Sequence, residues 1–413
     1  MKHKNIEVKE VKNDNFKVLH SKLIEYVEQK ELPCTIVLVY QNDEVIYCEK
    51  QGMADIENNV PIEFDSIFRI ASMTKPITAV AALMLYEEGK FSLDDPLSKF
   101  IPKAKNLRVF SKEEGDQLIT EVPNRELTIL DLFTHTGGIS YLASLTHPVD
   151  KKFTGLFQDK KWKSLAEAVN ALLDVPLLCQ PGTKWNYSLS IDVLGYLIEI
   201  LSGMPFDIFL QERIFNKLDM KDTGFFVPMK KMNRITRLYM KDNNGRLMPA
   251  PEKQQSFGTE KPKILSGGGG LVSTLSDYLK FAVMLLNNGR FGETRLLKEE
   301  TIRLMTQDYV VSRGITFINE DTFGPIPKPL IKLRLESAKG SGFGLGVRFQ
   351  MEDGAFPAGC HGWGGAFTTN YTVDPKNNMV FIFLSQIFPS FNTTEFYPMT
   401  IRNLIYEGLK SYS

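Results

Sequence analysis

The sequence holds few of the residues that build disulfide frameworks or metal sites. Its 413 residues include only 4 cysteines and 5 histidines. The cysteines are scattered and form no Cys-x-x-Cys pair, so reduced thiols in a cytoplasmic protein are the expected state. The histidines show no metal-ligand spacing, so neither a metal nor another cofactor is expected.

Long apolar runs and an excess of one charge are missing as well. No segment approaches the ~20 apolar residues that cross a bilayer, and the first ten residues lack the apolar core of a signal peptide. We therefore expect a cytoplasmic protein without a membrane span. The 49 basic and 49 acidic side chains cancel, so a nucleic acid partner is not expected. The sequence does not determine the oligomeric state.

The composition is that of a folded globular protein. Hydrophobic residues make up 43% and aromatic residues 11% of the chain, which is enough to bury a large core. At about 150 residues per domain, the length fits two or three units or one large two-lobed body.

Strand patterns lie near both ends of the chain. We expect strands at 35–40, 45–48, 346–350, 368–373 and 379–384, and helices at 14–30, 72–88 and 394–410. The middle reads mostly as helices joined by Pro and Gly turns. The sequence thus predicts an α+β fold whose antiparallel sheet is built from both termini and flanked by helices.

This pattern divides the chain into two lobes. Residues 1–95 plus 306–413 would form an α/β lobe, and residues 96–305 an inserted, mostly helical lobe, with the active site in the cleft between them. Residues 306–345 are irregular and rich in Pro, Gly and Lys. They are too long for a simple connector, which predicts a lid or a loop that lines the cleft.

Several well-known catalytic motifs are absent. The chain has no Gly-x-Ser-x-Gly elbow, no His-Glu-x-x-His, no Walker loop and no Gly-x-Gly-x-x-Gly after a strand. The run Gly267–Gly270 lacks the Lys-Ser/Thr that follows a phosphate loop. A close-packed turn is therefore the preferred interpretation of these four glycines.

One short segment does suggest chemistry. In Phe68–Pro76, "FRIASMTKP", Ser72 and Lys75 are three residues apart at the expected start of a helix. Both side chains would project from the same face, and the helix start favours a developing anion. A neutral, desolvated Lys75 could accept the proton of the serine hydroxyl, which is a poor nucleophile without such help.

This segment and four others in the chain resemble the sequence motifs of a known family. Phe68–Pro76 is similar to the first motif of serine β-lactamases and penicillin-binding proteins. Four further stretches follow in the order of the class C branch and of its relatives, the family VIII carboxylesterases. They are Leu127–Tyr141 "LTILDLFTHTGGISY", Pro181–Gly195 "PGTKWNYSLSIDVLG", Gly267–Asn288 "GGGGLVSTLSDYLKFAVMLLNN" and His361–Pro375 "HGWGGAFTTNYTVDP". The resemblance implies the β-lactamase-like (DD-peptidase) fold.

The resemblance also implies roles for individual residues. Ser72 would be the acylated nucleophile, and Lys75 and Tyr187 would move its proton. The phenol of Tyr187 would need a lowered pKa, for which the Lys75 ammonium is the physical means. The oxyanion hole would consist of the backbone N–H groups of Ser72 and Ala366.

Departures from the β-lactamase pattern concern the substrate. The third motif of β-lactamases is Lys-Thr-Gly, whereas this chain has Trp363-Gly364-Gly365, the form found in family VIII esterases. Losing the cation removes the partner of an anionic β-lactam, while a tryptophan offers an apolar wall to an ester. In the second motif, Leu189 stands where many relatives have asparagine.

Three other side chains are candidates near this site. Tyr141 matches a family position that lines the pocket, so it is expected to bind substrate together with Trp363. His361 either bonds to the strand of the third motif or faces the cleft and binds substrate. His135, just before a Gly turn, is explained by capping of a helix end.

The sequence thus predicts a serine hydrolase that acts on a small carboxylic ester. A β-lactamase, a D-alanyl-peptide hydrolase, an amide hydrolase and an acyltransferase on the same scaffold remain open, because fold likeness does not choose among them. A protein that only senses β-lactams or peptidoglycan fragments is the alternative outside the enzymes.

Overall fold

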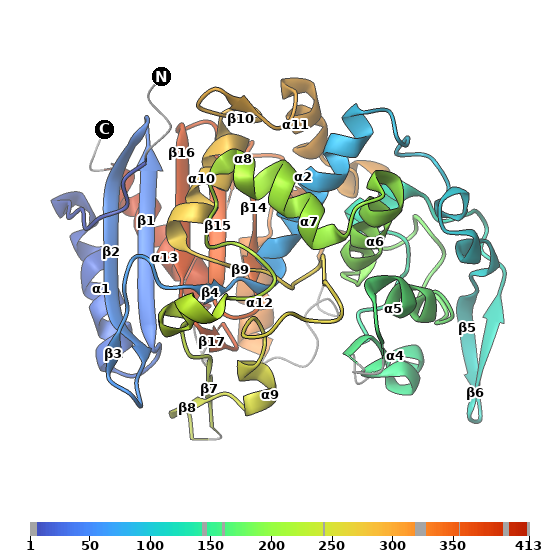
Figure 1. The fold of residues 1–413 in the computed structure, drawn as a ribbon, viewed down its shortest axis with the longest axis horizontal. Helices are drawn as coiled ribbons and strands as arrows, with labels where there is room; N and C mark the ends of the chain where they lie inside the picture. Colours follow the sequence, from blue (N-terminus) through green and yellow to red (C-terminus); the bar gives the residue numbers. More distant parts are fainter. Residues whose placement is uncertain are drawn as a thin grey trace.

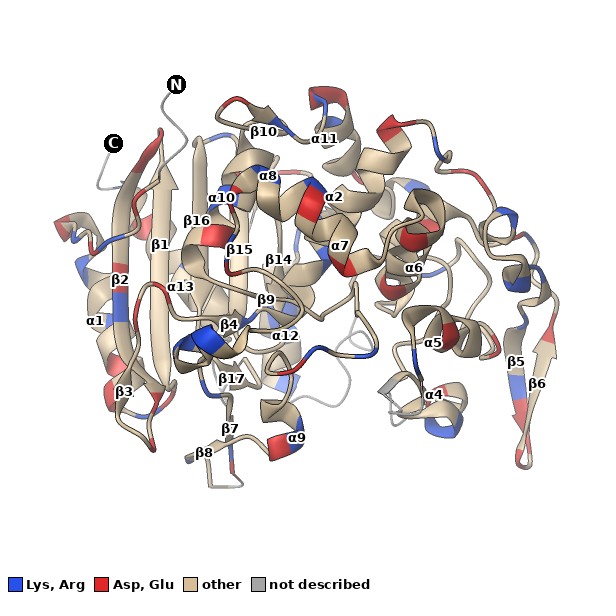
Figure 2. Ribbon diagram, in the orientation of Figure 1, with Lys and Arg blue, Asp and Glu red and all other residues tan. Residues whose placement is uncertain are grey.

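We describe the protein from a computed structural model. It covers residues 6–142, 147–158, 162–242, 244–318, 328–354, 356–390 and 396–410. Figure 1 shows a central sheet with helices on both of its faces and a more helical part to one side. Acidic and basic residues are interspersed over the described elements (Figure 2), as the balanced charge leads one to expect.

The central sheet has eight strands in the order β12-β13-β14-β15-β16-β1-β2-β3, and every neighbouring pair is antiparallel. The strands are β1 (Cys34–Gln41), β2 (Glu44–Asp55), β3 (Val60–Pro61), β12 (Ser341–Phe343), β13 (Arg348–Gln350), β14 (His361–Gly365), β15 (Thr369–Asp374) and β16 (Met379–Leu384). The prediction of an antiparallel sheet built from both termini is confirmed, because N-terminal β1 pairs with C-terminal β16 along six residues.

Strand β1 is buried on both of its faces, which explains the uninterrupted apolar run in its sequence. Ile36 and Leu38 belong to the larger core cluster on one face of the sheet, whereas Val37 and Val39 belong to a second cluster on the other face. A strand covered on both faces has no polar side to alternate with.

Different helices cover the two faces. Helices α1 (Lys17–Glu28) and α13 (Tyr397–Lys410) contact each other and contribute to the second cluster. On the opposite face, α10 (Leu275–Leu286) contacts β15 and β16. Helix α2 (Thr74–Glu87) is almost wholly buried in the larger cluster and contacts α6 (Ser190–Ser202).

Helices are the main secondary structure in the middle of the chain, and strands occur there as well. Its remaining α-helices are α3 (Ile129–Thr134), α4 (Pro148–Phe153), α5 (Leu165–Leu172), α7 (Phe206–Leu210), α8 (Asn216–Leu218), α9 (Glu252–Gln255) and α11 (Glu299–Met305). Two of these strands form the hairpin β5 (Val109–Glu114) and β6 (Gln117–Glu121), which projects at the edge of the helical part (Figure 1). Sequence reasoning missed this hairpin, whose strands are charged and half-exposed.

Short strands complete the fold. They are β4 (Phe68–Arg69) with β9 (Val272–Ser273), β10 (Arg290–Phe291) with β11 (Thr294–Arg295), and β17 (Ile387–Phe388) with β7 (Tyr239–Lys241) and β8 (Leu247–Pro249). The pair β4·β9 lies immediately before the segment that carries Ser72. It joins that segment to the chain that follows the glycine run 267–270.

The segment 306–345, expected to be irregular, contains helix α12 (Lys328–Ser337) in its described part. The division into lobes at residues 95 and 305 stays a prediction; α10, from the inserted segment, packs on the sheet. In the part of the chain that the structure describes, no single helix is long and apolar enough to cross a membrane. Helix α6 and the segment Phe206–Leu218 pass that test only together, and they are bent by 82°.

Candidate active site

Ser72 lies in a one-turn 3₁₀ helix, Ala71–Met73, that leads directly into α2. The side chain is 9% exposed. The preceding residue, Ala71, has a φ of 44°, which is unusual for a residue with a Cβ. Neighbouring segments hold this turn, since the Tyr278 hydroxyl donates to the Met73 carbonyl at 2.8 Å. A strained, tightly held turn of this kind is typical of functional sites.

Lys75 is buried beside Ser72, in the first turn of α2. Its Nζ lies 3.4 Å from the Ser72 Oγ and donates to the Gly268 carbonyl at 2.6 Å. Burial lowers the pKa of Lys75, although nearby Tyr141 and Asp192 act in the opposite direction. The shift favours the neutral amine, which can accept a proton.

A carboxyl group that sequence reasoning missed supports the lysine. Asp192, in the first turn of α6, is 1% exposed and accepts hydrogen bonds from the Ser266 hydroxyl at 2.5 Å and the Gly268 N–H at 3.2 Å. Burial raises its pKa, and Lys75 opposes that shift. The only sequence signal was an acidic residue in the first turn of a mostly apolar helix, five positions after Tyr187.

The glycine run 267–270 forms a close-packed turn, as its composition predicted. A Cβ at Gly268 would lie 2.4 Å from the Asp192 Oδ2, and one at Gly267 would lie 2.8 Å from the Ile191 carbonyl. No larger residue fits without moving these atoms. The turn therefore brings the carbonyl that accepts from Lys75 next to the carboxyl of Asp192.

Tyr187 lies just before α6, and its hydroxyl meets both the nucleophile and the third motif. The Trp363 Nε1–H donates to the Tyr187 oxygen at 3.4 Å, and a hydrogen bond also joins Tyr187 to Ser72. The Lys75 Nζ lies 4.5 Å from the centroid of the Tyr187 ring. The structure thus brings all three predicted catalytic side chains together.

The expectation of a lowered pKa for Tyr187 is wrong. Burial raises the pKa of this phenol to about 12, against the effect of its hydrogen bonds to Ser72 and Trp363. Because the same burial favours the neutral form of Lys75, the amine is the stronger candidate for the base. The phenol then remains protonated and is able to donate.

Aromatic rings hold Tyr187 in place. Tyr141 stacks on it with 5.4 Å between ring centroids, and Trp363 lies at 5.6 Å. His135 lies at 4.9 Å on another side. It caps the end of α3 in the left-handed conformation, as predicted, and its Nδ1 hydrogen-bonds to Ser188 at 3.0 Å.

Strand β14 approaches the serine turn closely at its end. A Cβ at Gly365 would lie 2.3 Å from the Ile70 carbonyl, so only glycine fits there. The Thr369 hydroxyl also donates to that carbonyl at 3.3 Å. This contact places Ala366, the next residue after β14, at the same cavity as Ser72. The oxyanion hole formed by their N–H groups stays a prediction.

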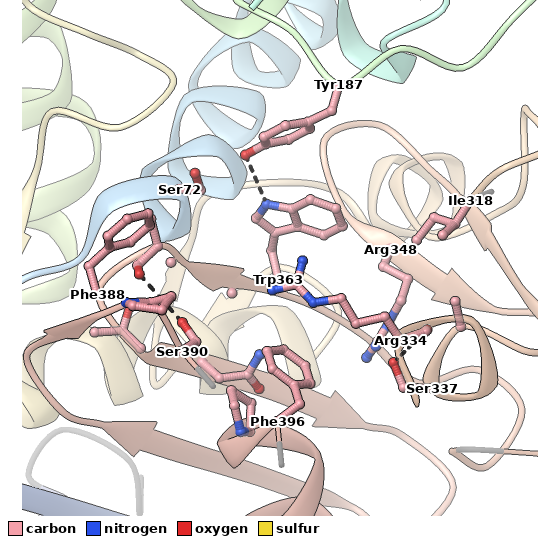
Figure 3. Close-up of a pocket in the computed structure, with 18 of the residues that line it drawn as sticks. Ser72, Tyr187, Ile318, Arg334, Ser337, Arg348, Trp363, Phe388, Ser390 and Phe396 are labelled. Atoms are coloured by element: carbon pink, nitrogen blue, oxygen red, sulfur yellow. Dashed lines mark hydrogen bonds between the residues drawn. The ribbon is translucent and has the colours of Figure 1, made fainter. Parts of the chain in front are cut away.

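A cavity of about 630 Å³ opens in front of these groups (Figure 3). The predicted site residues that line it are Ser72, Tyr141, Tyr187, Trp363, Gly364, Gly365 and Ala366. Among the described residues of the segment 306–345, Ile318, Arg334, Ser337 and Ala338 also line it. This segment lines the cavity, although much of its described part is helical rather than a loop.

His361 is not among the residues that line the cavity. It is 2% exposed at the start of β14, and its Nδ1 contacts the Gly359 carbonyl at 3.2 Å. Burial lowers its pKa to about 4, so the ring is neutral. Of the two expected positions for His361, the structure shows the one within the strand and not the one that faces the cleft.

No group of three or more His, Cys, Asp or Glu side chains could hold a metal ion in the part of the chain described here. The arrangement offers instead a hydroxyl, an amine and a phenol in mutual contact at a cavity wall. These are the parts needed for nucleophilic attack with proton transfer. The fold and this arrangement define a protein of the serine-hydrolase type with a β-lactamase fold.

Comparison with known proteins agrees with this class. The family model described as Beta-lactamase matches residues 19–401. The chain therefore belongs to the Beta-lactamase family, as its five motifs indicated.

Relatives and structural neighbours include esterases and acyltransferases. Esterase EstB of Burkholderia gladioli is 32% identical over 285 residues, which cover 65% of this chain and 69% of the esterase. EstCE1, described as a hydrolase with promiscuous acyltransferase activity, has a TM-score of 0.75 at 23% identity over 95% of this chain and 98% of its own. Simvastatin synthase (LovD) from Aspergillus terreus has a TM-score of 0.76 at 21% identity over 97% of this chain and 99% of its own. At such identities the two structures show the fold alone.

Proposed function

We propose that the protein is a carboxylic ester hydrolase that forms an acyl-enzyme on Ser72. The observation that carries this proposal is the contact of Ser72, Lys75 and Tyr187 at the wall of a cavity that Trp363 also lines. The motif resemblance aligns Trp363 with the lysine of β-lactamases, which favours a neutral ester over an anionic β-lactam. The esterase named among the relatives supports an ester as the substrate.

Acylation begins with the neutral amine of Lys75. The amine accepts the proton of Ser72, and the serine oxygen attacks the carbonyl carbon of the ester. The N–H groups of Ser72 and Ala366 stabilise the negative charge on the carbonyl oxygen. When the carbon–oxygen bond breaks, Tyr187 donates its proton to the leaving alcohol, and Lys75 returns a proton to Tyr187.

Deacylation follows the same path with water in place of the alcohol. Water attacks the acyl carbon while Tyr187 and Lys75 take up its proton. The bond to Ser72 then breaks, and the proton passes to the serine oxygen. Both groups regain their starting states, so one ester and one water give one acid and one alcohol.

The pH dependence tests this division of roles. We expect kcat/KM for an ester to rise with pH as Lys75 loses its proton, with a midpoint below the ordinary lysine value of 10.5. No decline from ionisation of Tyr187 is expected below about pH 11, because the pKa of its phenol is about 12. A pH–rate profile with subtraction of spontaneous hydrolysis measures both features. A decline between pH 7 and 10 that disappears in Tyr187→Phe would contradict the proposed roles.

Substrate preference tests the role of Trp363. A charge-assisted contact contributes roughly 1.5–3 kcal/mol, and each ~1.4 kcal/mol is a factor of ten. Because the cation is missing at this position, we expect kcat/KM for p-nitrophenyl butyrate to exceed that for nitrocefin by at least about one to two orders of magnitude. Trp363→Lys should move the ratio toward nitrocefin, with Trp363→Phe as the control that adds no charge.

Other outcomes of this experiment favour the alternatives. Nitrocefin turnover at least as efficient as that of short esters would mean a β-lactamase or a D-alanyl-peptide hydrolase. A stable acyl adduct on Ser72 without turnover would mean a sensor. An acyltransferase remains a second candidate because the relatives of this chain include one named acyltransferase calJ, from Penicillium decumbens, which is 25% identical over 80% of this chain. Product analysis with an added alcohol distinguishes transfer from hydrolysis.

A further inference from the structure

The cavity continues past Trp363 to side chains that carry positive charge. Arg334 of α12 and Arg348 of β13 both line it. Figure 3 shows the two side chains next to each other, below the indole of Trp363. Since they lie beyond the indole, they do not replace a cation at the position of Trp363 itself. Sequence reasoning missed both residues.

The sheet leaves room for these side chains at the edge of β14. Strand β13 pairs with β14 only at Arg348↔Gly362 and Phe349↔His361. Residues 363–365 therefore have no partner on that edge among the described strands. Gly364, which lines the cavity, has no side chain to cover this part of the strand. The cavity passes over this open edge, with Arg348 at the point where the pairing stops.

Arg348 has no counter-charge in the described part of the protein. Its guanidinium carbon lies 3.9 Å from the centroid of the Phe356 ring, and its Nε is buried without a hydrogen-bond partner. Its charged neighbour is another cation, Arg402, whose guanidinium carbon lies 4.4 Å from the centroid of the same ring. No carboxylate of the described residues forms an ion pair with Arg348.

Both guanidinium groups keep their charge at neutral pH. Burial lowers the pKa of Arg334 and of Arg348 to about 10 in each case, which is still well above 7. For Arg348, whose Nε is buried without a hydrogen-bond partner, this is unfavourable, because buried charges in proteins are normally paired. The guanidinium fork matches a carboxylate with two parallel hydrogen bonds. A carboxylate on a bound ligand would supply the missing partner.

The proposed chemistry indicates which part of an ester reaches this region. Tyr187 hands its proton to the leaving oxygen, and the Trp363 N–H contacts the Tyr187 hydroxyl. The alcohol part therefore leaves on the side of the cavity that Trp363 borders. An alcohol long enough to pass the indole arrives at the two arginines.

We propose that Arg348, together with Arg334, binds a carboxylate carried by the alcohol part of the ester, so that the preferred substrates are esters of hydroxy acids. This inference rests on the proposed function above and names its substrate class. Arg348 acts here as a specificity residue, since it contacts the substrate away from the reacting atoms.

Matched pairs of acetate esters test the proposal. The pairs are 4-acetoxybenzoate, 4-acetoxyphenylacetate and 3-(4-acetoxyphenyl)propanoate, each beside its neutral methyl ester. For each pair we compare the ratio of kcat/KM, anionic over neutral, between the wild type and Arg348→Met. Because both enzymes meet the same two esters, the intrinsic reactivity of the leaving groups cancels. We expect the ratio to fall at least about tenfold for the best-fitting pair, as for one charge-assisted hydrogen bond.

Two further variants control for charge and packing. Arg348→Lys keeps the charge and should retain part of the preference. Arg402→Met removes a buried guanidinium that packs on the same Phe356 ring but does not line the cavity. It should change the ratio less than about threefold. Thermal melting of each variant shows whether it is folded.

The outcomes separate this inference from the proposed function. Ser72-dependent hydrolysis of the neutral esters, with a ratio that Arg348→Met does not change, would overturn the carboxylate site and leave the esterase intact. A second comparison places the charge on the acyl part, with mono-p-nitrophenyl glutarate beside p-nitrophenyl butyrate. If Arg348→Met lowers the ratio of kcat/KM only for this pair, the assignment of the carboxylate to the alcohol part is overturned. If Arg402→Met lowers the ratio of kcat/KM as much as Arg348→Met does, the preference comes from the electric field of distant charges, and a direct contact between Arg348 and the carboxylate is overturned.

Binding gives an answer even if no ester is hydrolysed. Calorimetric titration of Ser72→Ala with 4-acetoxybenzoate needs no turnover. We expect Arg348→Met in that background to weaken binding at least about tenfold, and unchanged binding would overturn the proposal.

Discussion

Ser72→Ala is expected to lower ester hydrolysis by at least about 10⁴-fold and to abolish formation of an acyl adduct. The substitution removes one hydroxyl from a turn that other contacts hold, among them the hydrogen bond from Tyr278 to the Met73 carbonyl. The fold should therefore persist. Steady-state kinetics with p-nitrophenyl butyrate and intact-protein mass measurement after mixing test both parts.

Ser390→Ala is the matched control for this variant. Ser390 lines the same cavity and has the same exposed fraction as Ser72, 9%. Its loss should change kcat/KM by less than about tenfold. Turnover by Ser72→Ala close to that of the wild type would disprove the acyl-enzyme mechanism, whatever the behaviour of the control.

Lys75→Ala and Tyr187→Phe are each expected to lower kcat by at least about 10²-fold, the usual contribution of a positioned proton transfer. Both groups contact Ser72, and the amine lies 4.5 Å from the phenol ring. They are therefore expected to act as one unit, and the double variant should be little worse than the worse single one. Kinetics of the four proteins form a double-mutant cycle.

The cycle has a clear contrary outcome. Full additivity of the two losses would place Lys75 and Tyr187 in separate steps. His135→Asn serves as a control for packing around the phenol, because it removes a ring 4.9 Å from Tyr187 without touching the amine. It is expected to cost less than either substitution in the cycle.

The parts of the site that could be predicted were those encoded locally. Ser72 and Lys75 are three residues apart, so a helix start brings them together without any knowledge of the rest. The order of the five motifs then led to Tyr187 and Trp363. In the fold, β1 and β16 were visible because both faces are buried and the strands read as continuous apolar runs.

The parts that could not be predicted depend on contacts between distant segments. Asp192 is linked to Lys75 through Gly268, whose N–H donates to the carboxyl and whose carbonyl accepts from the amine. Arg348 reaches the cavity only because β13 stops pairing two residues into β14. The pKa of Tyr187 is raised and not lowered, because the effect of burial outweighs that of its hydrogen bonds.

The pairing of β1 with β16 has a consequence for how the protein is made. Gln41 pairs with Met379 and Ile36 with Leu384, so β1 is synthesised about 340 residues before its partner strand β16. Throughout that interval, the edge of β1 that β16 will cover has no native neighbour. The third-motif strand, β14, is also synthesised about 290 residues after Ser72, whose turn it contacts. The nucleophile is therefore among the first parts to emerge, and the site around it is completed only when nearly the whole chain has been translated.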